Sequence, residues 1–513
     1  MVRMMPTTIA KSLLVCLLVV HATPAGAAKQ VPAAPPAAAV PAPDAVPPNR
    51  PALAARLAAL VGSPVLHPQE TGIALLSLPD GRAIFERNAA TPLRPASTLK
   101  ILTSAAALAL LKPEFVFETR VCADGAVDAA GVLPGHLYIQ GRGAPDLVGE
   151  AWWLIARRLS DMGLRRVEGS LIADESYFDT VRRPPGWPPP AADSWYNAPI
   201  GALSCNFNVV TVRVEPSPLL GARPDLTLEP IASYFQVLNR ATTGSQATAI
   251  NVDRAFDQGQ NVLVASGTIR RGSGPVVLNR AVEEPALYAL HAFREIARQF
   301  GIEIAGGLGT GLVPEGARTL HRHESRPLAA LVRDMNKNSN NFMAEMILKT
   351  LGAQFIGIPG TTASGTEMVR AYLSGIGVDP SAAALADGSG LSDESRLTAR
   401  LLADVLLKAH ADFEIGPEMV TSLPIGGADG TLNDRFGGEE ARRRVRAKTG
   451  RIAGSITLAG YVTNRNGRTF AFAILANQPR GTIEAVHRTI DRLVDEIAAS
   501  ADADLPPPDS ARP

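Results

Sequence analysis

The chain has little cysteine, and this excludes a cysteine-based metal site. Of three cysteines in 513 residues, Cys16 lies in an N-terminal apolar segment, which leaves Cys122 and Cys205. Two cysteines have neither the number nor the spacing of a zinc site. In an exported chain they could form a disulfide, and the sequence leaves that pairing undecided. No cysteine or acidic cluster accompanies His321–His323, which we predict to be surface histidines, so we expect no metal and no cofactor.

The chain also lacks an excess of charge of either sign. Its 50 Lys and Arg residues oppose 49 Asp and Glu residues, for a net charge of +1. This balance argues against nucleic acid or an anionic membrane surface as a partner. Long hydrophobic runs are missing too, because Ser12–Val20 is shorter than the roughly 20 residues that span a bilayer. The hydrophobic content of 46% is nevertheless ample for sizeable cores.

The N-terminus has the pattern of an export signal. Arg3 and Lys11 form a basic start, Ser12–Val20 is the apolar segment, and Ala25–Ala27 suits signal peptidase. We therefore predict a signal peptide at residues 1–27 and export. A retained membrane anchor is the alternative. The sequence leaves peripheral membrane association and the oligomeric state undecided.

Two further segments are predicted to lie outside any folded core. Residues 28–50 are so rich in Ala and Pro that an extended linker is expected. Residues 501–513, with the ending ADADLPPPDSARP, are predicted to be a disordered tail.

The two ends of the remaining chain resemble each other in their order of elements. Residues 71–88 predict a hairpin, with Pro79–Gly81 as the turn. Two more strands are predicted around Asn464–Gly467, followed by a helix from Ile483 to Ala499. The predicted apolar face of that helix consists of Ile483, Val486, Ile490, Leu493, Val494 and Ile497. We predict an α/β (α+β) fold, with one sheet and helices packed on it.

The middle of the chain differs from both ends. Short strand candidates such as HLYIQG, NVVTVRVEP and NVLVASGTI alternate there with many glycines and prolines. We therefore predict that residues 51–115 and 312–500 form a split domain. Residues 116–311 are predicted to be a β-rich insertion in two subdomains.

The stretch RPASTLKILTSAAALALL begins a predicted helix with a serine and a lysine three residues apart. That spacing places Ser97 and Lys100 on one helix face. An N-terminal serine can place its backbone N–H beside a developing oxyanion, and a lysine of lowered pKa could accept the serine proton. A match to Ser-x-x-Lys alone is weak, because about two are expected by chance in a chain this long. A capping serine with a surface lysine is the alternative.

Two further motifs follow in order. Ser339–Asn341 begins another apolar helix, where Ser339 could simply be the N-cap. Lys448–Gly450 leads into a predicted strand, where it could be an ordinary turn. A chance Lys-Thr-Gly occurs on the order of 0.1 times per chain. The order Ser-x-x-Lys, Ser-x-Asn, Lys-Thr-Gly is the signature of class A β-lactamases and penicillin-binding proteins, with Asn340 where class A enzymes have Asp.

The spacing of the motifs narrows the resemblance. The gap from Ser97 to Ser339 is more than twice the gap from Ser339 to Lys448. A long insertion there resembles the class C low-molecular-mass penicillin-binding proteins, the D-alanyl-D-alanine carboxypeptidase/endopeptidase (DacB-type) family of serine peptidases. The stretches GLRRVEGSLIADESYFD, PPGWPPPAADSWYNAPIGALSCNFN, ADGSGLSDESRLT and SLPIGGADGTLNDRF resemble that family as well.

The resemblance implies a β-lactamase/transpeptidase-like fold and a site without metal. Ser97 would be the nucleophile, Lys100 its base, Ser339 a proton relay and Asn341 a holder of Lys100 and the substrate amide. Substrate binding would fall to Lys448, Thr449, Gly450 and Arg451, with the backbone amides of Ser97 and Arg451 as oxyanion hole. The implied partners are peptidoglycan stem peptides ending in D-Ala-D-Ala, their cross-links and β-lactams, in the periplasm.

The sequence departs from the family pattern at two places. Members often have Arg after Asp-Gly-Ser-Gly-Leu-Ser, where this chain has Asp393, with Arg396 three residues on. The acidic residue after Gly-Trp, which would bind the diamino acid of the stem, is replaced by Ala191 in the expected column, with Asp193 nearby. Tyr196 fits the aromatic residue beside it. Asp193 and Tyr196 are therefore the candidates for reading the substrate side chain.

Two other functions compete with this one. A β-lactamase would need rapid deacylation, yet no Glu-x-x-Leu-Asn motif precedes Lys448–Gly450. A non-catalytic binding or scaffold protein would use the insertion as an interaction module, but it would not need Ser97 and Lys100 together. A protein with both an active site and a docking surface is a third reading.

Overall fold

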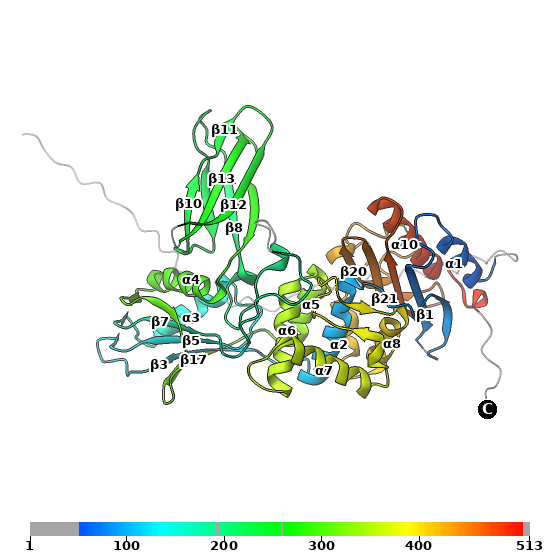
Figure 1. Ribbon diagram of the computed structural model, residues 1–513, viewed down its shortest axis with the longest axis horizontal. Helices are drawn as coiled ribbons and strands as arrows, with labels where there is room; N and C mark the ends of the chain where they lie inside the picture. Colours follow the sequence, from blue (N-terminus) through cyan, green and yellow to red (C-terminus); the bar gives the residue numbers. More distant parts are fainter. Residues whose placement is uncertain (1–50, 79, 190–194, 258–259, 439, 506–513) are drawn as a thin grey trace, which may run out of the picture. The chain divides into compact units, whose positions relative to one another are not determined.

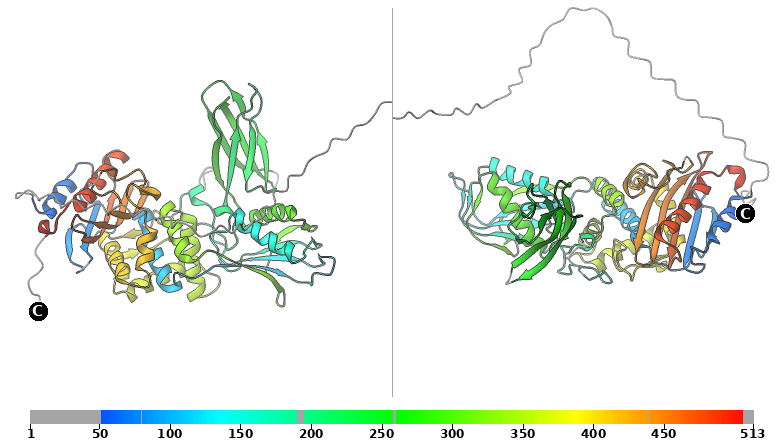
Figure 2. Two further views of the ribbon diagram at one scale, coloured as in Figure 1. Left: turned by 180° about the vertical axis from the view of Figure 1, so that it is seen from behind. Right: turned by 90° about the horizontal axis from the view of Figure 1, so that it is seen from above.

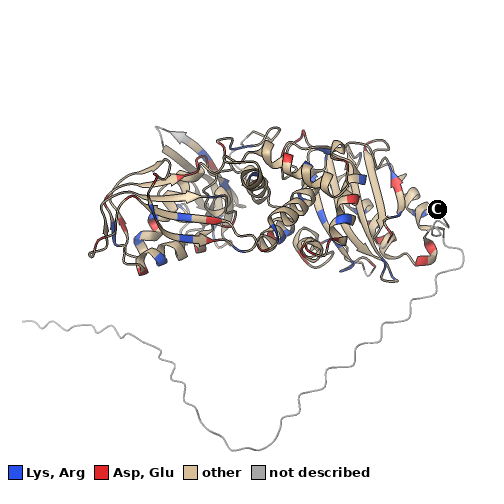
Figure 3. Ribbon diagram, turned by 90° about the horizontal axis from the view of Figure 1, so that it is seen from below, with Lys and Arg blue, Asp and Glu red and all other residues tan. Residues whose placement is uncertain are grey.

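A computed structural model describes residues 51–505 of the chain except residues 79, 190–194, 258–259 and 439. The predicted signal peptide, the whole predicted linker and most of the predicted tail lie outside this part. Among the helices described, none combines the length and apolar character needed to cross a membrane. Positions of Lys and Arg and of Asp and Glu are interspersed along the ribbon (Figure 3).

A five-stranded antiparallel sheet joins the two ends of the chain. Its strand order is β2-β1-β22-β21-β20. The strands are β1 (Thr71–Ser77), β2 (Ala83–Arg87), β20 (Val445–Ile452), β21 (Ser455–Thr463) and β22 (Thr469–Asn477). Both predicted hairpins are confirmed, and the pairing of β1 with β22 connects them, with Ile73 opposite Ile474. The N-terminal and C-terminal segments thus complete one sheet.

Helices cover both faces of this sheet (Figures 1 and 2). In β1, Ile73 and Leu75 belong to the core formed with α1 (Leu53–Val61) and α10 (Ile483–Ala498). Ala74 and Leu76 point the other way and belong to the core beneath the remaining helices, because successive strand residues face opposite sides. Those helices are α2 (Lys100–Leu111), α5 (Leu328–Asn338), α6 (Asn341–Phe355), α7 (Thr362–Gly375), α8 (Ala399–Ala411) and α9 (Gly416–Ser422). The predicted fold class is correct.

The last helix confirms its prediction with one exception. Val486, Ile490, Leu493, Val494 and Ile497 are buried, whereas the side chain of Ile483 is 44% exposed. Ile483 is the first residue of the helix, directly after the N-cap Thr482. The helix begins at the rim of a cleft, so its first residue has no core above it.

A second five-stranded sheet, β16-β7-β5-β3-β17, lies in the middle of the chain. Its strands are β3 (Glu118–Ala123), β5 (Leu137–Gly141), β7 (Leu171–Asp174), β16 (Leu308–Thr310) and β17 (Arg318–Glu324). Two helices, α3 (Gly149–Asp161) and α4 (Pro285–Gln299), accompany it, so the segment is less purely β than predicted. Strand β17 lies beyond the predicted boundary at residue 311 yet pairs with β3. Its polar sequence RTLHRHE suits a half-exposed edge strand and gave no sign of this pairing.

Two further sheets of the middle segment have the order β14-β8-β9 and β10-β13-β11, with β12 also on β13. Their strands are β8 (Val209–Glu215), β9 (Asp225–Glu229), β10 (Phe235–Asn239), β11 (Thr242–Gly244), β12 (Ala249–Asp257), β13 (Gln260–Arg270) and β14 (Val276–Ala281). The three quoted strand candidates fall on β5, β8 and β13 and are confirmed. The remaining short strands are β4 (Val132–Leu133), β6 (Arg166–Val167), β15 (Glu303–Ile304), β18 (Ala383–Ala384) and β19 (Arg396–Leu397).

The structure answers two questions that the sequence left undecided or answered wrongly. Cys122 and Cys205 are both buried and both free. The predicted tail begins too early, because residues 502–504 form a 3₁₀ turn in which Asp504 is buried. Asp504 accepts a hydrogen bond from Arg56 at 3.2 Å, which fixes this turn to α1.

Candidate active site

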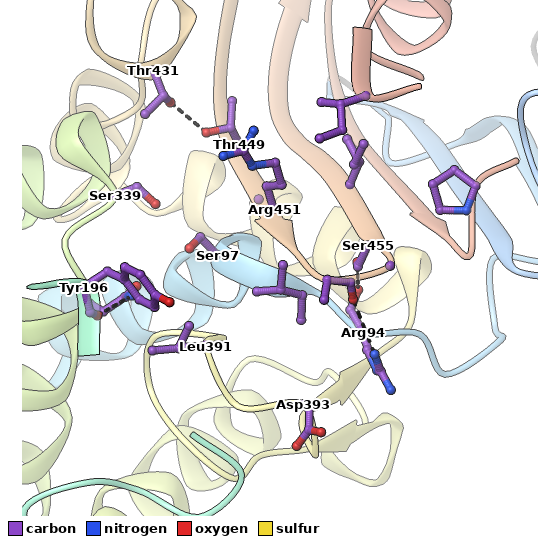
Figure 4. Close-up of a pocket in the computed structure, with 18 of the residues that line it drawn as sticks. Arg94, Ser97, Tyr196, Ser339, Leu391, Asp393, Thr431, Thr449, Arg451 and Ser455 are labelled. Carbon is purple, nitrogen blue, oxygen red and sulfur yellow. Dashed lines mark hydrogen bonds between the residues drawn. The ribbon is translucent and has the colours of Figure 1, made fainter. Parts of the chain in front are cut away.

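An open cleft of about 1130 Å³ contains Ser97 (Figure 4). Its lining includes residues from the turn before α2, the turn between α5 and α6, strand β20, the segment Trp195–Tyr196 and the loop around Leu391. The start of α10 and the residues around Thr431 also contribute. The three sequence motifs meet here although most of the chain separates the first from the last.

Ser97 lies in a 3₁₀ turn, Ala96–Leu99, that leads directly into α2. Ala96 has a φ of 47°, a left-handed backbone conformation that is uncommon outside glycine. Such strain persists only where the surroundings enforce it, and it is frequent at functional sites. The turn brings the Oγ of Ser97 to 3.0 Å from the Nζ of Lys100, which donates the hydrogen bond.

Lys100 is fully buried, and its ammonium group is held by three acceptors. Besides Ser97, these are the Oδ1 of Asn341 and the carbonyl oxygen of Ser389, each at 2.7 Å from Nζ. Burial lowers the pKa of Lys100 to about 7, against the opposing charges of Asp387 and Glu345, which raise it. A lysine with such a pKa is neutral in a large fraction of molecules at neutral pH, and only the neutral amine can accept a proton.

Ser339 is not the N-cap that its sequence position suggested. It is the left-handed residue, with φ 54°, that ends α5, and Asn340 caps α6 by accepting a hydrogen bond from the backbone N–H of Met343. Because Asn340 caps the helix, the Oγ of Ser339 is available at the cleft. There it accepts a hydrogen bond from the Nζ of Lys448 at 2.8 Å.

Lys448–Gly450 lies inside strand β20, not in a turn before a strand. Lys448 is fully buried, and its pKa is held well below the ordinary value by burial and by the nearby charge of Lys100. The hydroxyl of Thr449 donates to the Oγ1 of Thr431 at 2.7 Å on the cleft wall. Arg451, the residue after the motif, also lines the cleft (Figure 4).

Gly450 permits the close approach of β20 to Ser97. A Cβ at this position would be 2.9 Å from the backbone nitrogen of Ser97 and 2.2 Å from the Oγ1 of Thr457. Thr457 in turn donates to the carbonyl oxygen of Pro95, which holds the turn before Ser97. The edge of the sheet and the turn that carries Ser97 are therefore in contact only because residue 450 has no side chain.

The structure tests only some of the residues expected to bind the substrate side chain. Asp193 lies outside the described residues. Tyr196 is 44% exposed at the cleft, and its carbonyl oxygen accepts a hydrogen bond from the Nδ2 of Asn341 at 2.9 Å. Asp393 lines the cleft where family members often have Arg. The guanidinium of Arg396 donates instead to the carbonyl oxygens of Asp393 and Ser395 in its own loop.

The comparisons with known proteins agree with this geometry. The model of the D-Ala-D-Ala carboxypeptidase 3 (S13) family matches residues 53–501, nearly all of the described chain. The chain belongs to this S13 family. It is accordingly a serine-type D-Ala-D-Ala carboxypeptidase, a hydrolase, as its motifs predicted.

Individual S13 relatives match the chain over most of its length. It is 34% identical over 438 residues to the D-alanyl-D-alanine carboxypeptidase of Actinomadura sp. (strain R39), which covers 82% of this chain and 80% of the relative. It is 28% identical over 411 residues to the D-alanyl-D-alanine carboxypeptidase DacB of Haemophilus influenzae, covering 79% and 85%. The crystal structure of penicillin binding protein 4 (dacB) from Haemophilus influenzae superimposes with a TM-score of 0.73 at 25% identity, covering 86% of this chain and 97% of that one.

The S13 site includes groups that the motif search missed. The carbonyl oxygen of Ser389 contacts Lys100, and Asp387 braces its loop. Asp387 accepts hydrogen bonds from the Nε1 of Trp187, the hydroxyls of Ser389 and Ser395, and the backbone N–H groups of Leu391 and Ser392. The stretch ADGSGLSDESRLT supplied a signal, because it was part of the family resemblance, but nothing in it indicated a backbone contact with Lys100. Thr431 lies in SLPIGGADGTLNDRF, another stretch of that resemblance, whereas Glu345 carried no signal of its own.

Proposed function

We propose that Ser97 and Lys100 carry out acyl transfer from D-Ala-D-Ala peptides. The oxygen of Ser97 attacks the carbonyl carbon of the penultimate D-alanine while neutral Lys100 takes the hydroxyl proton. The C–N bond to the leaving residue then breaks and an acyl-enzyme forms. The observation that carries this proposal is the 3.0 Å contact between Ser97 and a buried lysine whose pKa is about 7. A general base works best when its pKa is near the working pH.

Ser339 is proposed to give its hydroxyl proton to the leaving amine and to regain a proton from Lys448, which in turn recovers the proton that Lys100 took from Ser97. The 2.8 Å hydrogen bond from Lys448 to Ser339 supports this relay. Lys448 and Lys100 are buried close together, so the protonation of one lysine disfavours the protonation of the other. Asn341 would orient Lys100 through Oδ1 while its Nδ2 faces the carbonyl oxygen of Tyr196 and the substrate amide.

Strand β20 is proposed to bind the substrate backbone and carboxylate. The backbone N–H groups of Ser97 and Arg451 would stabilise the oxyanion, and the close approach at Gly450 supports this pairing. Thr449 would bind the carboxylate of the terminal D-alanine. A water molecule would finally attack the acyl carbonyl carbon, add its hydroxyl group to it and return the proton to Ser97. No step of this sequence routes through a metal.

Covalent labelling with a penicillin tests the proposal. A β-lactam resembles the D-Ala-D-Ala end and is expected to acylate Ser97. Mass spectrometry of the peptide that contains Arg94–Lys100 should show the adduct on Ser97, and the Ser97→Ala variant should show none. If folded wild-type protein forms no adduct at any time after mixing, the acyl-transfer mechanism is wrong. Measured turnover of the penicillin would separate a slow-releasing carboxypeptidase from a β-lactamase.

Endopeptidase action would require room for a second stem peptide as the leaving group. A second cavity of about 440 Å³ shares Trp195, Tyr196, Asn338, Ser339 and Asn341 with the main cleft. Because the leaving amine would be protonated beside Ser339, a longer leaving group could extend into this cavity. We therefore propose that the protein cleaves cross-links between stems as well as terminal D-alanine.

This part is tested by filling the second cavity. Thr211 lines it from β8. The variant Thr211→Arg should lower kcat/KM for a cross-linked dimer at least about tenfold, and leave penicillin acylation and release of terminal D-alanine unchanged. Thr227→Arg, on the exposed face of β9, is the matched control. Equal loss of both peptidase activities would contradict the assignment.

We also propose export to the periplasm after cleavage behind Ala27. The basic start, the short apolar segment and the small residues at Ala25–Ala27 support it. The intact mass of the protein isolated from cells should correspond to a chain that begins at Ala28. A mass that includes residues 1–27 would indicate a retained anchor.

A further inference from the structure

Glu345 is a buried carboxyl group next to the proposed base that the mechanism does not yet use. It lies on α6, four residues after Asn341, so both side chains lie on the same face of the helix. Asn341 contacts Lys100 directly. Glu345 is fully buried behind it. A carboxyl group is rarely placed in such a position without a partner.

The contacts of Glu345 join it to the loop that holds Lys100. Its Oε1 accepts a hydrogen bond from the backbone N–H of Gly388 at 2.8 Å. The next residue, Ser389, offers its carbonyl oxygen to the Nζ of Lys100. Among the described residues, Oε2 of Glu345 has no hydrogen-bond partner although it is buried. An ionised carboxylate left in this state would be costly, whereas a protonated one would be much less so.

The surrounding charges come from three elements. Asp387, on the loop, and Lys349, one turn further along α6, act on Glu345, as does Lys100 on α2. Lys349 is engaged elsewhere, because its Nζ donates to Asp179 at 2.5 Å and to the carbonyl oxygen of Val181 at 2.8 Å. Lys448 of β20 is the other charged group near Lys100. Two carboxyl groups therefore face Lys100, and only Asp387 is surrounded by donors.

We propose that Glu345 is a positioning residue for Lys100. It holds the Gly388–Ser389 peptide against the lysine, and it is protonated at the working pH, so that Lys100 faces a single negative charge. The inference rests on the proposed role of Lys100 as the base.

The electrostatics agree with this geometry. Burial, and next the charge of Asp387, raise the pKa of Glu345 to about 8. An ionised Glu345 would raise the pKa of Lys100, so its protonation keeps that pKa low. Below about pH 8 the carboxyl group therefore helps to keep the base neutral.

The pH dependence of acylation by a penicillin tests the inference. The second-order rate constant would be measured between about pH 6 and pH 10 for wild type and for Glu345→Gln. The glutamine keeps an acceptor for Gly388 and cannot ionise. Because the glutamine resembles the protonated carboxyl group, its acid limb should coincide with that of wild type, and it should lack the further inflection that ionisation of Glu345 above about pH 8 gives wild type. Glu367→Gln, an exposed glutamate on the neighbouring α7, should superimpose on wild type.

Each outcome has a distinct meaning. If wild type is not acylated at any pH, the proposed function fails before the role of Glu345 is reached. If wild type is acylated and the acid limb of Glu345→Gln lies at clearly lower pH than that of wild type, Glu345 is ionised at the working pH and the inference is wrong. The inference is also wrong if the two proteins have identical profiles up to about pH 10. Infrared difference spectroscopy of wild type is a second measurement, which can be made even if the variant does not fold. If Glu345→Gln folds, the loss of the band in that variant assigns the band to Glu345. The inference requires a protonated carboxylic acid band near pH 7 that disappears as the pH rises past about 8.

Discussion

At the scale of single residues, the site depends on two lysines that the fold keeps out of water. An exposed lysine is almost entirely protonated at neutral pH and cannot act as a base. Burial without a directly bonded carboxylate changes this for Lys100, whose acceptors are a hydroxyl, an amide oxygen and a backbone carbonyl oxygen. All three are neutral, so they orient the amine without fixing its charge.

The buried lysine gives stability a defined pH dependence. The pKa of Lys100 is about 7 in the folded protein and about 10.4 in an unfolded chain. Between these values the unfolded state binds the additional proton, so the contribution of Lys100 to the free energy of unfolding increases with pH. The cost of burying it is greatest below about pH 7.

We expect the Lys100→Met variant to lose acylation and to gain stability relative to wild type mostly at low pH. The difference in free energy of unfolding between variant and wild type should shrink as the pH rises from about 7 to about 9.5. Denaturant unfolding at several pH values measures it. A difference that does not change with pH would contradict the lowered pKa of Lys100.

Gly450 gives a second prediction at this scale. Gly450→Ala forces a Cβ against the backbone of Ser97 and the hydroxyl of Thr457. The penicillin acylation rate should fall at least about a hundredfold, because small displacements at the reacting atoms are that costly. Gly309→Ala in β16, where a Cβ meets nothing within 4 Å, is the control and should leave the rate unchanged.

At the scale of elements, two neighbouring residues in the turn between α5 and α6 have different roles, one in helix stability and one in the proposed reaction. Asn340 caps α6, and Ser339 contacts Lys448. The two neighbours are similar polar residues and either could have been the cap. The left-handed conformation of Ser339 decides the assignment, because it turns that side chain away from the start of the helix.

Substitution of Asn340 should therefore affect stability, whereas substitution of Ser339 should affect acylation. Asn340→Ala should lower the free energy of unfolding by about 1 kcal/mol and change acylation little. Ser339→Ala should lower the acylation rate by at least about tenfold with little change in unfolding. Thermal unfolding and penicillin acylation of both variants provide the comparison. If Ser339→Ala proves the more destabilising change, the sequence reading of Ser339 as the cap would be restored.

At the scale of the whole molecule, one sheet depends on both ends of the chain. Strand β1 pairs with β22, and α1 and α10 share one core. Arg56 of α1 donates to Glu496 at 2.8 Å and to Asp504 at 3.2 Å, which joins the N-terminal helix to the turn after α10. The last described residues therefore belong to the folded domain.

Truncation tests this connection. A chain that ends at Ala501 loses Asp504 and should unfold with a free energy lower by about 1 to 3 kcal/mol, because a largely buried guanidinium loses one of its partners. A chain that ends at Leu505 should match wild type. Equal stability of both truncated chains would show that the turn contributes nothing.

Much of the site could be predicted from the sequence, because the motifs are local. Ser97 and Lys100 are three residues apart, so helical geometry alone brings them together. The hairpins and the last helix followed from turn residues and apolar periodicity, which are also local. The same reasoning failed where a neighbour in space decided the outcome. The apolar periodicity of the helix places Ile483 on its buried face. The residue is nevertheless exposed, because it lies at the rim of the cleft.

The sequence by itself determined the three motifs, their order along the chain and the placing of Ser97 and Lys100 three residues apart. Only the tertiary structure decided that Ser389 accepts from Lys100, that Glu345 lies behind it, and that β17 pairs with β3 beyond the predicted boundary. The reason is physical. A pKa, a cavity and a strand pairing depend on which groups are close in space, and in this chain those groups come from segments hundreds of residues apart.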